Sequence, residues 1–403
     1  MSGPLESTDA GAGGPAGARR GDVWSAASVS GPLDSTDPGV GGSSSARRGD
    51  VWSAADVSGP AGSTDPRAAG GAVSGRPGGD RRVGVVVLTT GERPRELAAA
   101  LASVHRQREV TPEVVVVVNS EAPDAPDRVR AAIEAPADAA AGGGDGAAAD
   151  VGGAEAKDGG AAGNARVAAK VLTPGRHLGI PEGRNLGVAA VEDSEVVLFL
   201  DDDGELVGDD VLARASAEFA VDPTLAVLSL RIVDPDTGAT QRRHVPRLRV
   251  GDATRSSWVT TFLGGASVVR VSAFREAGGL PARFFYAHEE TSLAWRLLDR
   301  GYRIRYAAEL AMAHPATPPA RHAAYYRLTG RNRVLLARQH LPAPLAVVYV
   351  LLWVVLGVAR TRGGRRALLD GFVEGLRAPA VVREPISWRT VWRMTRYGRP
   401  PLL

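Results

Sequence analysis

Three consecutive aspartates, Asp201 to Asp203, directly follow the apolar run VVLFL in this chain of 403 residues. An apolar run of this length is typical of a buried strand, and three like charges at its end repel one another unless a cation lies beside them. Mg²⁺ and Mn²⁺ prefer one or two protein carboxylates together with phosphate oxygens. The stretch therefore predicts a site in which Mg²⁺ or Mn²⁺ joins the protein to a diphosphate.

A second acidic pair, Glu289 and Glu290, precedes a helical pattern in TSLAWRLLDRG. A carboxylate that faces a hydroxyl group can act as a general base, which a group transfer to a hydroxyl requires. Carboxylates are also typical of a helix N-terminus, where they offset the helix dipole. Arg296 follows at a spacing from which it is expected to pair with either glutamate. The absence of cysteine excludes thiol catalysis, disulfides and thiolate metal sites.

The elements around the acidic turn predict an α/β fold with a mainly parallel sheet. Runs of β-branched residues alternate with helical stretches, in the order RRVGVVVLTT, RPRELAAALASVHRQ and EVVVVVNS. Such alternation is the signature of a parallel sheet covered by helices. Ligands of open α/β sheets bind at the carboxyl ends of strands, where the three aspartates lie. This placement favours a ligand site over the alternative, an acidic loop before a helix capped by Asp209 or Asp210.

The chain divides into three regions. Residues 1–80 repeat SGPLESTD-like units and have no apolar face, which predicts a disordered tail. Residues 81–315 form the predicted catalytic domain, interrupted at 122–165 by a low-complexity insertion whose composition favours disorder. Residues 316–403 are predicted to be helical and basic.

The C-terminal region predicts contact with a membrane. From Arg321 onward it has 15 arginines against 3 acidic residues, which indicates an acidic partner. The segment 345–359 has no charge and is flanked by arginines, and Trp388 and Trp392 are interleaved with arginines as in interfacial helices. We expect an anionic membrane surface, at the cytoplasmic face of the cell membrane. Nucleic acid is not expected, because no nucleic-acid-reading motif accompanies the charge. A helix packed on the catalytic domain is the alternative.

From Val83 to about Leu341 the sequence resembles the family 2 glycosyltransferases, inverting enzymes with the Rossmann-like GT-A fold. Five segments carry the resemblance, in chain order: TTGERP, HLGIPEGRNLGVAAV, LFLDDDGEL, the block from FLGGASVV to RGYRIRY, and AMAHPAT. The resemblance implies transfer of a sugar from a nucleotide-sugar donor, with Mg²⁺ or Mn²⁺ as cofactor. A general similarity to rhamnosyltransferase-like members implies a deoxyhexose donor and a cell-envelope acceptor.

The resemblance also implies roles for individual residues. Asp203 is expected to bind the metal directly, and Asp201 to contact the nucleotide ribose or a metal-bound water. His314 is expected to complete the metal or diphosphate site, and Asp202 to be structural. Glu290 takes the position of the catalytic base, and Glu289 is the second candidate. The residues expected to bind the nucleotide sugar are Thr89, Arg93, Asn119, Gly179, Arg184, Asn185 and Asp201.

The predicted function is a metal-dependent inverting glycosyltransferase that moves one sugar to a hydroxyl of a cell-envelope glycan or lipid-linked acceptor. A single addition is expected because the Q-x-x-R-W motif of processive synthases is absent after Glu290. One alternative is a haloacid dehalogenase-like phosphatase, whose D-x-D-G motif DDDG matches. Such enzymes need a downstream Lys or Arg. Both lysines, Lys157 and Lys170, lie upstream, but an arginine could substitute, so this alternative stays open. The other alternative is a sugar-nucleotide-binding scaffold without a catalytic base.

Overall fold

A computed structural model describes residues 81–135, 168–315, 324–361, 363–380 and 382–402. The predicted tail at residues 1–80 lies outside the described residues. So do most of the predicted insertion and the first residues of the predicted C-terminal region.

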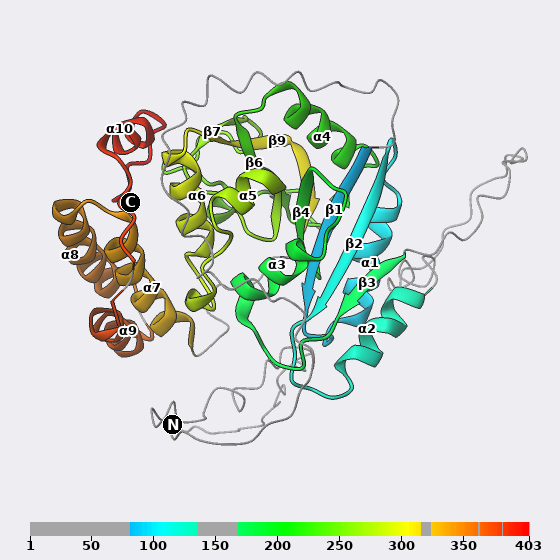
Figure 1. Ribbon diagram of the computed structural model, residues 1–403, viewed down its shortest axis with the longest axis horizontal. Helices are drawn as coiled ribbons and strands as arrows, with labels where there is room; N and C mark the ends of the chain where they lie inside the picture. Colours follow the sequence, from blue (N-terminus) through cyan, green and yellow to red (C-terminus); the bar gives the residue numbers. More distant parts are fainter. Residues whose placement is uncertain (1–80, 136–167, 316–323, 362, 381, 403) are drawn as a thin grey trace, which may run out of the picture.

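The described residues contain one nine-stranded sheet at the centre of the molecule (Figure 1). The strand order is β3-β2-β1-β4-β8-β6-β9-β5, and β7 pairs with β9. The strands are β1 Arg81–Thr89, β2 Val110–Val118, β3 Ala169–Leu172, β4 Val196–Asp201, β5 Glu205–Val207, β6 Leu225–Val233, β7 Ser257–Val259, β8 Ala266–Arg270 and β9 Arg303–Ala313.

The sheet has a parallel half and a mixed half. Strands β3, β2, β1 and β4 are parallel, as the sequence predicted. Beyond β4, strand β8 is antiparallel to both β4 and β6, whereas β6 and β9 are parallel. A parallel return requires a crossover, usually a helix, and the chain between β6 and β8 holds only β7 and a short 3-10 helix, Arg242–His244. The predicted mainly parallel sheet is therefore corrected, because the pairings of β8 with β4 and β6, of β5 with β9 and of β7 with β9 are all antiparallel.

Helices cover both faces of the sheet, which confirms the predicted α/β class. They are α1 Pro94–His105, α2 Ala125–Glu134, α3 Gly179–Ala189, α4 Val211–Val221, α5 Val271–Glu276, α6 Glu289–Asp299, α7 Ala324–His340, α8 Ala343–Arg360, α9 Arg365–Arg377 and α10 Trp388–Arg396. Successive residues of a strand point to opposite faces. Accordingly, Val86 of β1 lies in the core that includes α3, α5 and α6, whereas Val85 and Val87 lie in the core that includes α1, α2 and α4.

The predicted insertion at 122–165 has an ordered beginning, which corrects its predicted start. Helix α2 lies within that range, and its residues Ala125, Val129 and Ala132 are buried in the core beside α1. Their spacing is helical, so α2 has the narrow apolar stripe that a helix on a sheet needs. The surrounding alanine- and proline-rich composition concealed this stripe in the sequence.

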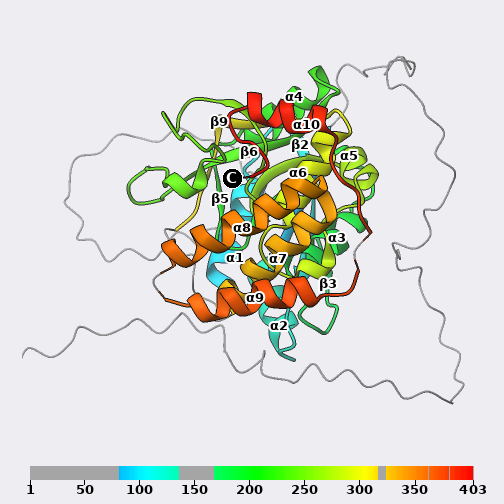
Figure 2. The ribbon, with the colours of Figure 1, turned by 90° about the vertical axis from the view of Figure 1, so that its left-hand side faces the viewer.

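Helices α7 to α10 gather at one end of the molecule (Figures 1 and 2). The C-terminal half of α7 packs in the main core through Leu335, Leu336 and Ala337. The next helix, α8, has 18 residues and a mean hydropathy of 2.1, and is long and apolar enough to cross a membrane. Tyr349 is the only buried residue of this helix. The helix predicted from the apolar segment is therefore present, and it packs on the protein through one face.

Candidate active site

The acidic turn after β4 is neutralised by basic side chains from other elements. Arg93, immediately before α1, forms ion pairs with Asp202, at 2.6 Å, and with Asp203. Asp202 is buried and also accepts a hydrogen bond of 2.6 Å from Thr89 at the end of β1. The Nε2 atom of His314 lies 3.1 Å from the other carboxylate oxygen of Asp203. Asp202 therefore fixes the turn to β1, while Asp203 lies between two basic groups.

Burial and these partners shift the pKa values of the turn in opposite directions. Burial raises the pKa of Asp202 to about 7, against the charge of Arg93 and the hydrogen bond from Thr89. Burial also acts to raise the pKa of Asp203, but the hydrogen bond and charge of His314 leave it below its ordinary value. Burial lowers the pKa of His314, and the interaction with Asp203 raises it overall. Asp203 is therefore held in its ionised form.

Three side chains of this region can hold a divalent metal. One ligand atom from each of Asp201, Asp203 and His314 lies within 4.8 Å of the other two. Two carboxylate oxygens and one imidazole nitrogen suit Mn²⁺, and Mg²⁺ binds through carboxylates with phosphate oxygens and water completing its shell. The three residues predicted to bind the metal are thus brought together by the ends of β4 and β9.

Arg184 of α3 links the acidic turn to the second acidic pair. Its buried guanidinium lies 3.1 Å from Asp201 and 3.6 Å from Glu290. Gly264 and Gly265 pass closely over these groups. A Cβ atom on Gly264 would overlap Glu290 and Arg184, and one on Gly265 would overlap Asp201. Because Gly264 and Gly265 have no side chains, there is room for the carboxylates of Asp201 and Glu290 to lie beside the Arg184 guanidinium.

Glu289 and Glu290, at the start of α6, lie in different environments. Glu289 is 2% exposed, whereas the side chain of Glu290 is 22% exposed. Burial raises the pKa of both, and that of Glu289 is raised well above its ordinary value. The charge of Arg184 and a hydrogen bond with Glu289 lower the pKa of Glu290 and so oppose the effect of its burial. The pKa of Glu290 nevertheless stays above its ordinary value, and the pKa of Glu289 is raised the more strongly of the two.

The side chains of Asn119 and Asn185 form hydrogen bonds with backbone groups of neighbouring segments. The side chain of Asn119 accepts a hydrogen bond of 2.6 Å from the Leu178 amide and donates to the Gly179 carbonyl. Gly179 has a φ of 76°, which favours glycine. Asn185 exchanges two hydrogen bonds with the backbone of Leu280. Both amide groups thus position the chain at α3, where the sequence predicted direct contact with the nucleotide sugar.

Arg296 does not form the predicted pair with either glutamate of α6. Its guanidinium donates instead to the backbone carbonyls of Ala277 and Gly279. Arg184 occupies the place beside Glu290 that was expected for Arg296. Helical spacing made Arg296 a reasonable candidate, but it places the arginine on the buried side of α6, facing the 277–279 turn.

Sequence reasoning missed Asn332 of α7, which holds the segment before α6. Its buried Nδ2 donates to the carbonyls of Phe284, Tyr286 and Ala287, at 2.9, 2.7 and 2.9 Å. Ala287 and His288 both have a φ of 70°, a conformation that costs free energy in residues other than glycine. Asn332 therefore helps to hold a strained turn that directs Glu289 and Glu290. The signal in the sequence was one asparagine within the helical run RNRVLL.

Comparison with known proteins agrees with the chemistry of the site. Residues 196–362 match the family described as glycosyl transferase family group 2. This range contains the acidic turn, the glycine pair, Glu290 and His314. The match supports a glycosyltransferase enzyme of the family 2 type. A search of curated protein sequences gave no match.

Solved structures that resemble this chain include the following three. One is the mannosyltransferase PcManGT from Pyrobaculum calidifontis in complex with GDP-Man and Mn²⁺, with 20% identity and a TM-score of 0.46 over 79% of this chain and 85% of that chain. Another is S. aureus TarS 1–349, with 14% identity and a TM-score of 0.45 over 73% of this chain and 81% of that chain. A third is GalNAc-T7 with UDP, GalNAc and Mn²⁺, with 14% identity and a TM-score of 0.47 over 75% and 55% of the two chains.

Proposed function

We propose that this protein is a metal-dependent inverting glycosyltransferase with a GT-A fold. It moves one sugar from a nucleotide-sugar donor to a hydroxyl of a cell-envelope glycan or lipid-linked acceptor. The observation that carries the proposal is the position of Arg184, whose guanidinium lies 3.1 Å from Asp201 and 3.6 Å from Glu290. The Arg184 guanidinium is therefore close both to Asp201, one of the candidate metal ligands, and to the separate carboxylate of Glu290. Transfer from a diphosphate to a hydroxyl needs these two functions close together.

Each residue of the site has a separate role in this proposal. Asp203, Asp201 and His314 would hold Mg²⁺ or Mn²⁺, which when bound supplies a Lewis acid that neutralises charge on the departing diphosphate. Arg93, paired with Asp203, offers a second positive charge to the same diphosphate. Glu290 accepts the proton of the acceptor hydroxyl, so that the oxygen can attack the anomeric carbon from the face opposite the diphosphate.

Arg184 and Glu289 both act to keep Glu290 ionised, the form in which it can accept a proton. The charge of Arg184 lowers the pKa of Glu290 against the effect of burial, and the hydrogen bond with Glu289 acts in the same direction. A base in a partly buried site is ionised only if its surroundings supply such support. The deoxyhexose donor implied by the resemblance is part of the same proposal.

The phosphatase alternative fits the geometry less well. A phosphoryl-transferring aspartate needs a basic residue free to hold the transferred phosphoryl group. Among the described residues, Lys170 is the one lysine, and it pairs with Glu192 on the surface at 3.0 Å. The arginines at the acidic turn, Arg93 and Arg184, precede it in the chain and already pair with its aspartates. The scaffold alternative does not account for Glu290, a partly exposed carboxylate held beside the metal-ligating group.

A panel of nucleotide sugars incubated with the protein and Mn²⁺ separates the three functions. We expect release of a nucleoside diphosphate, slowly to water and faster when an acceptor is present. Release of phosphate from simple phosphate esters would identify a phosphatase. Binding of the nucleotide sugar with no product would identify a scaffold.

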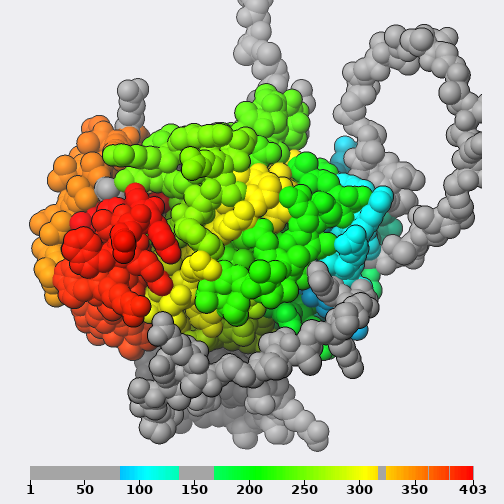
Figure 3. Space-filling model, turned by 90° about the horizontal axis from the view of Figure 1, so that it is seen from above, coloured from blue at the N-terminus to red at the C-terminus, as the bar shows by residue number. Residues whose placement is uncertain are grey.

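We further propose that helices α7 to α10, here called the C-terminal layer, associate with the cytoplasmic face of the membrane. Val347, Val348, Leu351 and Val355 are exposed on α8, and Trp388 and Trp392 are exposed on α10. Arg360, Arg365 and Arg366 follow the apolar face of α8 and are also exposed. These helices gather at the same end of the molecule (Figures 2 and 3). Apolar and tryptophan side chains beside arginines suit an anionic lipid surface.

The double substitution Leu351→Gln with Val355→Gln is expected to weaken binding to vesicles that contain anionic lipid by at least about 10-fold, because burial of each apolar side chain stabilises the bound state. Co-sedimentation with vesicles measures this. Val221→Gln is the matched control, since Val221 is 85% exposed on α4, outside the C-terminal layer. Equal sedimentation of the double variant and the original protein would show that α8 does not contact lipid.

A further inference from the structure

The end of β6 and the connection that follows it contain polar side chains without partners. Buried polar atoms that have no hydrogen-bond partner among the described residues include Nε of Arg231, Oγ1 of Thr240 and Nδ1 of His244. Arg231 is on β6, and the other two are in the connection between β6 and β7. A buried polar atom without a partner costs free energy. Several such atoms within one short segment indicate a ligand that pairs with them.

The sheet places Arg231 beside the candidate metal ligands. Strands β8 and β6 lie between β4, which ends at Asp201, and β9, which His314 follows. Asp201 and His314 nevertheless have ligand atoms within 4.8 Å of each other, so their side chains meet over the ends of β8 and β6. Val233, the last residue of β6, accepts a hydrogen bond of 2.9 Å from the His314 amide. Arg231 therefore lies near the end of the strand over which the two ligands meet.

Gly265 leaves the face of the sheet open between Asp201 and Arg231. The Asp201 amide donates a hydrogen bond of 3.1 Å to the Gly265 carbonyl, and a Cβ atom on Gly265 would overlap the Asp201 carboxylate. On the other side of β8, Ser267 is opposite Ser229 of β6. Continuing this antiparallel register by two residues places Gly265 opposite Arg231. Residues that are directly opposite point to the same face, so Arg231 is on the face of Asp201 with only a glycine between them.

Arg231 has no anionic partner among the described residues. Its partly buried guanidinium forms no ion pair or hydrogen bond with them. Burial raises the pKa of Tyr306, and the charge of Arg231 acts in the opposite direction. Arg93 and Arg184, in contrast, already pair with carboxylates of the acidic turn. A partly buried cation without a counter-ion favours an anion that a ligand supplies.

His244 offers a hydrogen-bond donor beside His314. The two rings lie edge-to-face, with their centroids 6.4 Å apart. The Nε2 atom of His244 accepts a hydrogen bond of 3.2 Å from Nε of Arg243, so the hydrogen of the neutral ring is on Nδ1. Nδ1 is the atom without a partner. His244 does not belong to the group of candidate metal ligands, so its donor is available to another group of the ligand.

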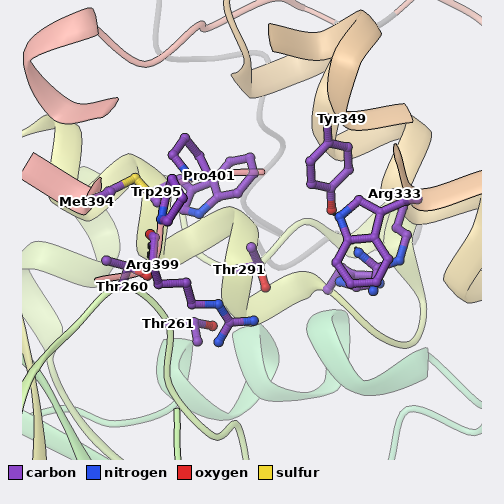
Figure 4. Close-up of a pocket in the computed structure, with 12 residues that line it drawn as sticks. Thr260, Thr261, Thr291, Trp295, Arg333, Tyr349, Met394, Arg399 and Pro401 are labelled. Atoms are coloured by element: carbon purple, nitrogen blue, oxygen red, sulfur yellow. Dashed lines mark hydrogen bonds between the residues drawn. The ribbon is translucent and has the colours of Figure 1, made fainter. Parts of the chain in front are cut away.

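The connection that carries His244 is held in place by packing. Val245 is buried in the main core, next to His244 in the chain. Figure 4 shows Thr260 and Thr261, directly after β7, beside Arg399 in the wall of a small cavity of about 50 Å³. Thr260 is buried, and its hydroxyl donates to the Arg399 carbonyl at 3.4 Å. The polar groups are thus positioned before a ligand binds, which lowers the entropy cost of binding.

We propose that Arg231 and His244 bind the diphosphate of the nucleotide-sugar donor, an inference that rests on the proposed glycosyl transfer. Phosphate oxygens accept hydrogen bonds from guanidinium and imidazole groups, and those from a charged donor are the stronger ones. In the transfer, the bond between the anomeric carbon and a β-phosphate oxygen breaks, and its electron pair stays on that oxygen. Arg231 then neutralises part of the charge that develops on the departing group.

Calorimetric titration of UDP and GDP into the full-length protein with Mn²⁺ tests the proposal. We expect Arg231→Gln to weaken binding of the nucleoside diphosphate by about 10-fold or more, because a charge-assisted hydrogen bond is lost. His244→Leu is expected to weaken it by about 5-fold. His244→Asn can still donate from a position close to Nδ1 and should restore most of the affinity. Arg82→Gln is the matched control, since it removes an arginine of β1 that pairs with the exposed Asp193.

Nucleoside monophosphates locate the contact on the diphosphate. UMP and GMP have no β-phosphate, so Arg231→Gln should bind them as the original protein does. Equal weakening of monophosphate and diphosphate binding would overturn the β-phosphate contact. Diphosphate affinity that is unchanged in both Arg231→Gln and His244→Leu would overturn the proposal. Thermal unfolding checks the fold of each variant, and Arg231→Lys, which keeps the charge, should retain part of the affinity if Arg231→Gln does not fold.

Failure of this inference is distinguishable from failure of the proposed function. If neither UDP nor GDP binds to the original protein with Mn²⁺, the donor site itself is refuted. If one binds and the variants bind it equally well, the function stands and the roles of Arg231 and His244 fall. Kinetics give a further readout, because departure of the diphosphate is common to donor hydrolysis and sugar transfer. Arg231→Gln should lower kcat for both by the same factor, and a fall in transfer alone would place Arg231 at the acceptor instead.

Discussion

Replacing Glu290 with glutamine is expected to lower the rate of sugar transfer by about 10²–10⁴-fold, the usual cost of losing a general base. Glutamine has nearly the same size and retains a carbonyl oxygen beside Arg184, so the fold and donor binding should change little. It cannot accept the proton of the acceptor hydroxyl. Steady-state transfer assays should therefore show a fall in kcat, with the affinity for the donor maintained. Donor hydrolysis is expected to fall less than transfer, because water needs less help at an oxocarbenium-like centre than a hindered hydroxyl.

Glu289→Gln is the matched comparison. Glu289 is buried, and its raised pKa favours the protonated form that donates to Glu290. A glutamine amide can still donate this hydrogen bond, so the expected loss is much smaller. If Glu289→Gln were the inactive variant and Glu290→Gln the mild one, the base would be Glu289, and the proposed roles of the two residues would have to be exchanged.

Replacing Asp203 with asparagine is expected to abolish metal-dependent turnover. A neutral amide is a poor ligand for Mg²⁺ or Mn²⁺, and the ion pairs of Asp203 with Arg93 and His314 would be lost as well. Activity measured over a range of Mn²⁺ concentrations should show little response to metal in this variant. Thermal unfolding of the protein checks that the fold persists.

Asp202→Asn is the control for the acidic turn. Asp202 contacts Thr89 and Arg93 and does not belong to the group of metal-ligating side chains. Because its pKa is about 7, it is partly protonated near neutral pH, so a neutral amide changes its charge only in part. Its metal response should stay close to that of the original protein. Full activity of Asp203→Asn at limiting Mn²⁺ would remove Asp203 from the metal site.

Much of the site could be predicted because its residues follow directly from local patterns. A buried β-branched run located β4, and therefore placed the acidic turn at the carboxyl end of a strand. Acidic residues before a helical pattern placed Glu289 and Glu290 at the start of α6. The mutual approach of Asp201, Asp203 and His314 was expected from resemblance alone, and the structure brings the three side chains together.

The sequence could not reveal contacts between residues far apart in the chain. Arg184 of α3 lies beside Glu290 of α6 only in the folded chain, where Gly264 leaves room for both side chains, and helical spacing favoured Arg296 instead. Asn119 and Asn185 have the same donors and acceptors whether they bind a nucleotide or a backbone amide, so their residue type could not distinguish the two. The direction of β8 likewise depends on the path of the loop after β6. The spacing of apolar residues in the sequence does not specify that path.

The most direct test of a metal-dependent nucleotide-sugar enzyme is calorimetric titration of UDP and GDP into the full-length protein, with Mn²⁺ and again with excess chelator. We predict that at least one nucleoside diphosphate binds in the presence of Mn²⁺ and that chelation removes this binding. The same titration of Asp203→Asn should resemble the chelated protein. Equally tight binding with and without Mn²⁺ would contradict a metal held by Asp201, Asp203 and His314 at the diphosphate.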